Sequence, residues 1–193
     1  MKMISKEIIL ILVLFFFHTG STEGEDCPHI VPRGGWATIP PKSINYLIVP
    51  IPYVIIHHSV TPECTTRSGC VNRLENIRDY HMTDLKSNDI GFNFMIGGDG
   101  NIYEGCGWTL EGAHTYGFNK RSISIMFVGN FQEKKVNSTF LDLAHKLILC
   151  GKDQGMLRED VKVIGGRQAI STASPGLELF LQIQDWPEWA QNP

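Results

Sequence analysis

Apolar and polar positions along this chain recur with two periods, one typical of strands and one typical of helices. The β-branched run Val54-Ile55-Ile56 ends in His57 and His58, and turn-rich polar sequence follows. Such a run is typical of a buried strand, which we expect over residues 53–59. Further strands are predicted at 92–96, 102–104, 122–130 and 161–164, with a hairpin turn of Gly, Asp and Asn at 97–101.

Three helices are predicted from apolar residues that recur every three or four positions. They cover about 68–85, 138–155 and a last segment that begins near Pro175. Residues 25–52 contain six prolines, so we expect an extended surface arm there, anchored by Trp36. The pattern predicts a single α/β domain: a central mixed β-sheet flanked by about three helices, with an N-terminal extended arm.

The first 24 residues predict a secretory signal peptide. Two lysines precede an unbroken apolar run over residues 8–17, and small and polar residues follow. The run is too short to span a bilayer, although a membrane anchor is the alternative interpretation. We expect cleavage between residues 20 and 24, a folded domain over 25–193, and a soluble, secreted protein that does not associate with membranes.

The net charge of −3 is unchanged by removal of residues 1–24, because that segment carries two lysines and two glutamates. A chain with no basic excess is a poor ligand for polyanions, so nucleic-acid binding is not expected. Asn137-Ser138-Thr139 is a glycosylation sequon, which has meaning only if the chain is secreted.

Five cysteines are present, and in a secreted chain an odd number leaves one unpaired. Cys64 and Cys70 flank a short polar loop that is easily closed, and Cys27 could tie the N-terminal tail to the helix that holds Cys150. That arrangement leaves Cys106 free, although the sequence does not determine the connectivity. Cys106 is then either an intermolecular or partner-bound thiol or a buried, inert one.

The adjacent histidines at the strand end have two interpretations. They are metal ligands or general bases, or they are hydrogen-bonded histidines at the rim of the sheet. A lone histidine pair does not distinguish the two, so the remainder of the chain has to decide.

Six segments of the chain carry a recognisable pattern in a fixed order: 54–59, 89–100, 102–108, 112–119, 128–131 and 174–176. Together they resemble the short peptidoglycan recognition proteins of insect and vertebrate innate immunity, a family related to the zinc amidases of phage lysozyme type. The resemblance covers about residues 27–189. What the resemblance implies is an amidase-like fold and a groove that binds muramyl peptides.

Catalytic members of this family hold Zn²⁺ with two histidines and a cysteine and leave a fourth position for water. The matching positions here are His57, Gly166 and Ser174, and the assisting tyrosine and threonine match Phe92 and Thr172. Glycine has no side chain to coordinate metal, and an alcohol is a poor zinc ligand. Neither zinc nor any other cofactor is therefore expected, and the catalytic positions are interpreted as vestigial.

The resemblance further implies ligand contacts in the groove. The matching residues are His58, His81, His114 and Thr115, with Phe92, Trp108 and Tyr116 nearby. Neutral imidazoles offer a donor and an acceptor each, and aromatic faces add apolar area. His58 and His114 could in principle replace lost metal ligands. We expect His58 to point away from the face of His57, however, and His114 to contact peptide.

The type of stem peptide is predicted from a missing arginine. Family members that recognise diaminopimelate carry an arginine where this chain has Cys106, and a guanidinium grips the extra carboxylate. Without that group, lysine-type peptidoglycan is favoured. Lys86, in the loop after the first helix, could supply a compensating charge.

The predicted function is that of a secreted pattern-recognition receptor of innate immunity. It would bind peptidoglycan without zinc amidase activity and signal to other secreted recognition or protease-cascade proteins. One alternative is a metal-independent stem-peptide hydrolase that uses Ser174, Thr172 and His57. Another is residual N-acetylmuramoyl-L-alanine amidase activity.

Overall fold

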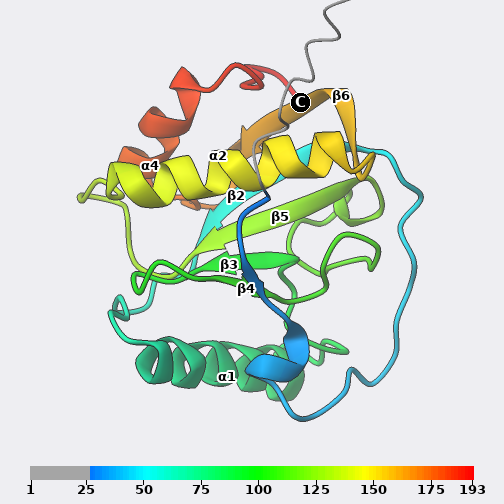
Figure 1. Cartoon of the computed structure of the whole chain (residues 1–193), viewed down its shortest axis with the longest axis vertical. Coiled ribbons are helices and arrows are strands. Elements are labelled where there is room, and N and C mark those ends of the chain that lie inside the picture. Colours follow the sequence, from blue (N-terminus) through cyan, green and yellow to red (C-terminus); the bar gives the residue numbers. More distant parts are fainter. Residues whose placement is uncertain (1–26) are drawn as a thin grey trace, which may run out of the picture.

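The computed structural model describes residues 27–193, and the predicted signal peptide lies outside them. Six strands form one mixed sheet in the order β1-β4-β3-β5-β2-β6 (Figure 1). All neighbouring strands run parallel except the β3–β4 hairpin. The strands are β1 (Ile30–Val31), β2 (Ile51–His58), β3 (Phe94–Ile96), β4 (Ile102–Glu104), β5 (Ser122–Phe127) and β6 (Leu157–Gly165).

Helices cover both faces of this sheet. Helix α1 (Arg67–Thr83) lies on one side, and α2 (Ser138–Asp153) with α4 (Leu177–Gln182) lies on the other (Figure 1). The one-turn helix α3 (Gly166–Ala169) follows β6, and short 3₁₀ turns occupy Arg33–Gly35, Asn119–Arg121 and Ile183–Asp185. None of the helices in the described residues is long and apolar enough to cross a membrane. The structure confirms the predicted α/β architecture.

The core explains why β2 is apolar at consecutive positions. Val54 and Ile56 pack into the cluster that contains residues of α2 and α4. In β3 and β5, the alternate residues Met95 and Met126 pack into the cluster beneath α1. Because successive side chains of a strand point to opposite faces, a sheet covered on both faces requires apolar residues throughout.

Several element boundaries differ from the sequence-based expectation, and two short elements were not predicted. Strand β6 begins at Leu157 rather than 161, because exposed polar residues are tolerated at the start of this edge strand. The short elements β1 and α3 carry no periodic pattern and were not predicted. The last helix begins at Leu177, since Gly176 before it has a φ of 90° that is incompatible with a helix.

The N-terminal arm is held to the sheet, as predicted. The indole of Trp36 is buried and donates to the Glu104 carbonyl over 2.7 Å. The disulfide Cys27–Cys150 joins the start of the arm to α2. These contacts, with β1 pairing to β4, anchor the proline-rich segment.

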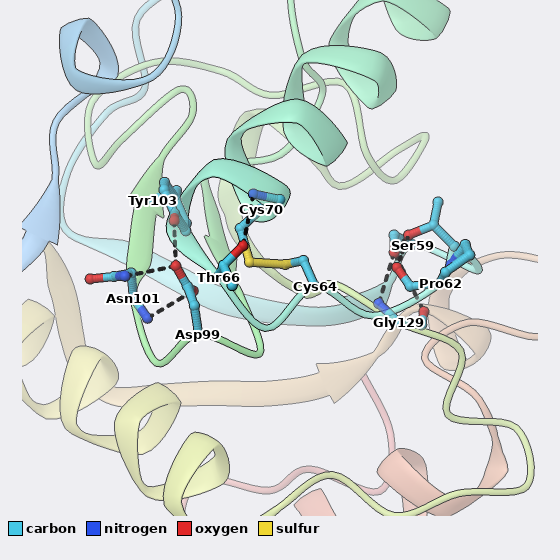
Figure 2. The surroundings of a disulfide bond; sticks show 11 residues. Ser59, Pro62, Cys64, Thr66, Cys70, Asp99, Asn101, Tyr103 and Gly129 are labelled. Carbon is cyan, nitrogen blue, oxygen red and sulfur yellow. Dashed lines mark hydrogen bonds between the residues drawn. A yellow bond between two sulfur atoms is a disulfide. The ribbon is translucent and has the colours of Figure 1, made fainter.

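The second predicted disulfide, Cys64–Cys70, closes the loop before α1 and lies beside the β3–β4 turn (Figure 2). In that turn Asp99 accepts hydrogen bonds from the Tyr103 hydroxyl and the Asn101 amide, 2.7 and 2.8 Å away. A Cβ at Gly98 would lie 2.4 Å from the Cys64 carbonyl oxygen, so glycine permits the close approach of turn and loop.

Candidate functional site

The candidate site lies at the carboxyl end of β2, between its parallel neighbours β5 and β6. Ligand sites of open α/β sheets form at this edge, because the loops that leave parallel strands meet there. His57 and His58 are the last two residues of β2. The segments around 114 and 174 supply the nearest polar side chains.

His57 is enclosed, with 5% of its surface exposed. Its Nδ1 lies 3.0 Å from the Ser174 hydroxyl, and its Nε2 lies 2.9 Å from the Thr115 hydroxyl. The Thr115 hydroxyl also lies 3.0 Å from Nδ1 of His114. We call this set, Ser174, His57, Thr115 and His114, the buried polar chain.

Hydroxyl chemistry gives the buried polar chain a consistent order of protons. The backbone N–H of His58 donates to the Ser174 oxygen over 3.2 Å, so the hydroxyl proton of Ser174 is available to Nδ1 of His57. Nε2 of His57 then donates to Thr115, and Thr115 donates to Nδ1 of His114. In this arrangement each hydroxyl both accepts and donates, and Nε2 of His114 carries a proton. That nitrogen is buried without a hydrogen-bond partner in the described part of the chain.

Burial keeps these imidazoles neutral. Loss of hydration, with a smaller contribution from the neighbouring His58, lowers the pKa of His57 to about 3. Burial also holds the pKa of His114 well below its ordinary value, and the neighbouring His57 lowers it in addition. At neutral pH the chain therefore contains hydrogen-bonding groups and no charge.

Gly166, the first residue of α3, lies against the His57 ring. A Cβ at this position would be 2.6 Å from Cε1 and 2.9 Å from Nδ1 of His57. The ring thus occupies the space that a side chain at 166 would need. The three positions that the resemblance assigns to metal ligands, His57, Gly166 and Ser174, do meet in space. Thr172 is exposed, and its hydroxyl accepts from the Ser174 backbone N–H over 3.2 Å.

A groove of about 330 Å³ opens between the end of β2 and helix α1. It is lined by His58, Ser59, Thr61, Arg73, Asn76, Ile77, Tyr80, His81 and Phe92. Beyond His58, the Ser59 hydroxyl accepts from the Gly129 N–H over 2.9 Å and fixes the strand end (Figure 2). We refer to this hollow as the groove.

His58 lines the groove and has one ring nitrogen without a hydrogen-bond partner in the described part of the chain. Its Nδ1 accepts from the Phe131 N–H over 3.2 Å, whereas its buried Nε2 has no partner among residues 27–193. The rings of His57 and His58 thus have separate partners. Burial lowers the pKa of His58 to about 4, and the Arg167 charge acts in the same direction. The imidazole is therefore neutral, and Nε2 carries its proton.

His81 and Phe92 continue the wall of the groove. Nδ1 of His81 accepts from the Gly91 N–H over 2.8 Å, so the Nε2 of this histidine is also a donor. Burial lowers the pKa of His81, and the charge of Asp89 partly opposes that shift. The Phe92 ring centroid lies 5.6 Å from that of His57 and 5.5 Å from that of His81, which connects the groove to the buried polar chain.

Five predicted ligand residues lie outside the groove lining. His114 and Thr115 belong to the buried polar chain, and the other three are Lys86, Trp108 and Tyr116. Tyr116 is 90% exposed, and Lys86 is exposed with a φ of 56° in the loop after α1. Trp108 packs on Phe94, with ring centroids 4.5 Å apart, and borders a different hollow of about 520 Å³. That second hollow lies between the arm and the segment 104–113.

Cys106 also borders the second hollow and is the unpaired cysteine. Its thiol donates to the Ile90 carbonyl over 3.3 Å. Burial, reinforced by the charge of Asp89, raises the pKa of Cys106 to about 12. A thiol of this kind is protonated and unreactive at neutral pH, which favours the interpretation as an inert thiol.

Sequence reasoning did not identify Arg73, Asn76 and Tyr80, which line the groove from α1. A signal was present, because these polar residues follow one another at three- and four-residue steps on a predicted helix. Asn137, the sequon residue, is exposed and uses its side-chain oxygen to cap α2.

Within residues 27–193, no group of three or more His, Cys, Asp and Glu side chains is arranged to hold a metal ion. The arrangement contains N–H donors, hydroxyls and aromatic faces. Such groups suit a ligand rich in amides, hydroxyls and carboxylates.

Comparison with known proteins gives matches over nearly the whole chain. The family model described as N-acetylmuramoyl-L-alanine amidase matches residues 49–177. Peptidoglycan-recognition protein SA of Drosophila melanogaster is 44% identical over 188 residues, which is 96% of this chain and 93% of the relative.

Solved structures agree with this result. The structure of PGRP-SA from Apis mellifera is 62% identical with a TM-score of 0.84, and the match covers 86% of this chain and 100% of that one. A variant of Drosophila PGRP-LB, solved in complex with tracheal cytotoxin, is 36% identical with a TM-score of 0.82. That match covers 84% of this chain and 96% of the PGRP-LB chain.

Proposed function

We propose that this chain, which belongs to the N-acetylmuramoyl-L-alanine amidase family and within it to the peptidoglycan-recognition proteins, binds bacterial peptidoglycan and does not hydrolyse it. The observation that carries the proposal is a groove with open donors beside a site that has kept one imidazole and no other metal ligand. The groove supplies hydrogen-bond donors for a ligand, whereas the described residues lack the set of zinc ligands that would activate a water molecule.

The groove supports the binding half of the proposal. The Nε2–H groups of His58 and His81 suit the carbonyl oxygens of a muramyl peptide, and Phe92 offers an apolar face. His114 and Thr115 belong to the buried polar chain, in which the Thr115 hydroxyl lies within hydrogen-bonding distance of both His57 and His114. The relative PGRP-LB, solved with tracheal cytotoxin, supports a ligand of this chemical class.

Zinc does not fit the residues present. Both ring nitrogens of His57 are engaged by hydroxyls, Gly166 has no side chain, and Ser174 would have to ionise to bind zinc. A hydrolytic zinc needs three protein ligands and an open position. We infer that the loss of donors at 166 and 174 removed the amidase activity.

We further propose that the protein acts outside the cell, after removal of the signal peptide, and passes the binding event to secreted recognition or protease-cascade proteins. The two disulfides are typical of oxidising compartments. The exposed Asn137 is accessible to a glycan. Because Cys106 stands where an arginine would grip diaminopimelate, and Lys86 lies outside the groove lining, lysine-type peptidoglycan is the proposed ligand.

The decisive experiment combines binding, activity and metal content on one sample. Purified protein is mixed with lysine-type and diaminopimelate-type muramyl peptides, and release of L-alanine amino termini is followed with and without a chelator. Zinc is assayed on the same protein. We expect binding, tighter for the lysine type, with no release and no bound zinc. Chelator-sensitive release would overturn the proposal.

A second candidate function rests on one distance. The Ser174 hydroxyl lies 3.0 Å from Nδ1 of His57, as in a nucleophile–base pair, and the Thr172 hydroxyl holds the Ser174 backbone. The other ring nitrogen of His57 meets the Thr115 hydroxyl instead of a carboxylate, and a pKa of about 3 makes His57 a weak base. We therefore place this hydrolase second.

Mass spectrometry of a muramyl tetrapeptide after incubation separates the two functions. We expect the mass to stay unchanged with the wild-type protein and with Ser174→Ala. Loss of a residue from the peptide with the wild type, abolished in Ser174→Ala, would establish the hydrolase instead.

A further inference from the structure

We propose that Arg73 binds a carboxylate of the stem peptide and makes the protein sensitive to the amidation of that peptide. The inference rests on the proposed function, because it assigns a charge partner to a ligand in the same groove. Arg73 is not among the residues that the family resemblance implied.

The first observation is that Arg73 has no partner among the residues that the structure describes. It lines the groove from α1, and its Nε is buried without a hydrogen bond. In the described part of the chain it forms no ion pair, whereas Arg33 and Arg78 both bind the Asp89 carboxylate. A buried guanidinium N–H without an acceptor is unfavourable, so an acceptor supplied by a ligand would be bound strongly.

The second observation concerns the other walls of the groove. Nε2 of His58 is a donor on a side chain that is 6% exposed, and it also has no partner in residues 27–193. His81 presents a further Nε2–H, since its Nδ1 accepts from Gly91. The residues that line the groove include no Asp and no Glu. The groove therefore combines the positive charge of Arg73 with neutral imidazole donors, and no acidic residue in its lining neutralises that charge.

Carboxylate is the anion that fits this donor set. The planar guanidinium of arginine matches the two oxygens of a carboxylate, and the neutral imidazoles add single hydrogen bonds. Ile77 and Phe92 supply apolar surface that limits competition from water. In a lysine-type muramyl pentapeptide, carboxylates occur at the γ-linked D-glutamate and at the C-terminal D-alanine. Both can be replaced by amides without a change of shape.

The proposal separates two kinds of specificity. Cys106 lies in the second hollow and outside the groove, so in this proposal it bears on the third stem residue alone. Arg73 lies in the groove and would report whether a carboxylate common to all stem peptides is free or amidated.

Isothermal titration calorimetry with four synthetic muramyl pentapeptides tests this. All contain lysine, and they differ in having an acid or an amide at the D-glutamate and at the C-terminus. We expect the wild type to bind one acid about ten-fold more tightly than the matching amide. Arg73→Gln should lose that factor and bind acid and amide alike. The position at which amidation matters then identifies the carboxylate.

Arg67→Gln is the matched control, since Arg67 begins the same helix, is exposed and lies outside the groove lining. It should retain the wild-type discrimination. Arg73→Lys keeps the charge without the planar fork, and we expect part of the ten-fold factor to remain. The ligand series also tests the proposal on the wild type alone, so it does not depend on how well a variant folds.

Two results would overturn the inference. If the wild type binds all four peptides equally, or if Arg73→Gln discriminates as the wild type does, Arg73 is not the carboxylate partner, while the proposed function stands. If the wild type binds none of them, the proposed function fails and the inference fails with it.

Discussion

His57 and His58 are neighbours in β2, and their surroundings differ in one decisive respect. Both ring nitrogens of His57 are bonded within the buried polar chain, to Ser174 and Thr115. His58 lines the groove and has one ring nitrogen bonded to the Phe131 N–H, whereas its other ring nitrogen is buried with no partner in residues 27–193. The first histidine completes an internal network, and the second offers a donor to something outside the protein.

The difference shows how a former metal position and a ligand groove can share one strand end. A histidine whose two ring nitrogens both have partners, as in His57, contributes to stability and gains nothing from a ligand. A buried polar atom without a partner costs stability until a ligand supplies one. The buried polar chain is thus expected to respond to changes in folding conditions, and the groove to changes in ligand.

The largest expected effect is that of pH on the buried polar chain. The pKa of His57 is lowered to about 3 from an ordinary value of 6.5, so below pH 6.5 the unfolded chain binds a proton that the folded protein refuses. Stability from His57 is complete above that pH and is lost as the pH falls towards the folded value. The loss is about 1.4 kcal/mol per pH unit.

Urea unfolding between about pH 7.5 and pH 4.5 measures this dependence. In His57→Asn the slope of unfolding free energy against pH should decrease, whereas the exposed His29→Asn should leave it unchanged. An equal slope in wild type and His57→Asn would contradict the prediction.

A smaller effect is expected from filling the space beside His57. In Gly166→Ala the new Cβ would meet Cε1 of His57 at 2.6 Å, so the ring must move and strain its bond to Ser174. Overpacking of this kind costs about 2 kcal/mol. It opposes the gain of about 1 kcal/mol that alanine normally brings to a helix.

Thermal and urea unfolding of Gly166→Ala give the net sign. Gly34→Ala is the control, because a Cβ at Gly34 would have nothing within 4 Å. A stabilised Gly166→Ala protein would show that His57 is not held in place by its hydroxyl partners.

The smallest effect on stability is expected at His58. His58→Phe keeps a ring of similar size, removes the acceptor for the Phe131 N–H and removes the open donor. The free energy of unfolding should fall by about 1 kcal/mol, and affinity for a muramyl peptide should fall about ten-fold. Calorimetry and urea unfolding, with His29→Phe as control, measure both. Unchanged affinity would place the ligand away from Nε2 of His58.

Much of the fold was predictable because its strands and helices are strongly periodic. The apolar run of β2 and the three- and four-residue spacing in α1 and α2 led to correct elements, and the turn residues 97–101 predicted the hairpin. The elements that were not predicted, β1 and α3, are two and four residues long. They form because neighbours pair with them, and no local pattern records that.

The candidate site was predictable only in part. The ordered motifs identified the family and matched His57, Gly166 and Ser174 to its metal-ligand positions. The structure places these three residues together. Trp108, expected near the ligand, borders the second hollow rather than the groove, and its contact with ligand stays a prediction. Adjacent positions in a motif can be separated by a turn of the chain, and the sequence does not show on which side of the sheet each one emerges.

The sequence by itself determined the α/β architecture, the family and the missing donor side chains at 166 and 174, because these follow from periodicity and residue identity. Only the tertiary structure decided which polar atoms have partners. The two hydrogen bonds of the His57 ring join it to residues that are 58 and 117 positions away in the sequence. The lack of a partner for Nε2 of His58 and for Arg73 within residues 27–193 likewise depends on how separate elements pack. Hydrogen bonds act over about 3 Å, so their presence is settled by the folded arrangement alone.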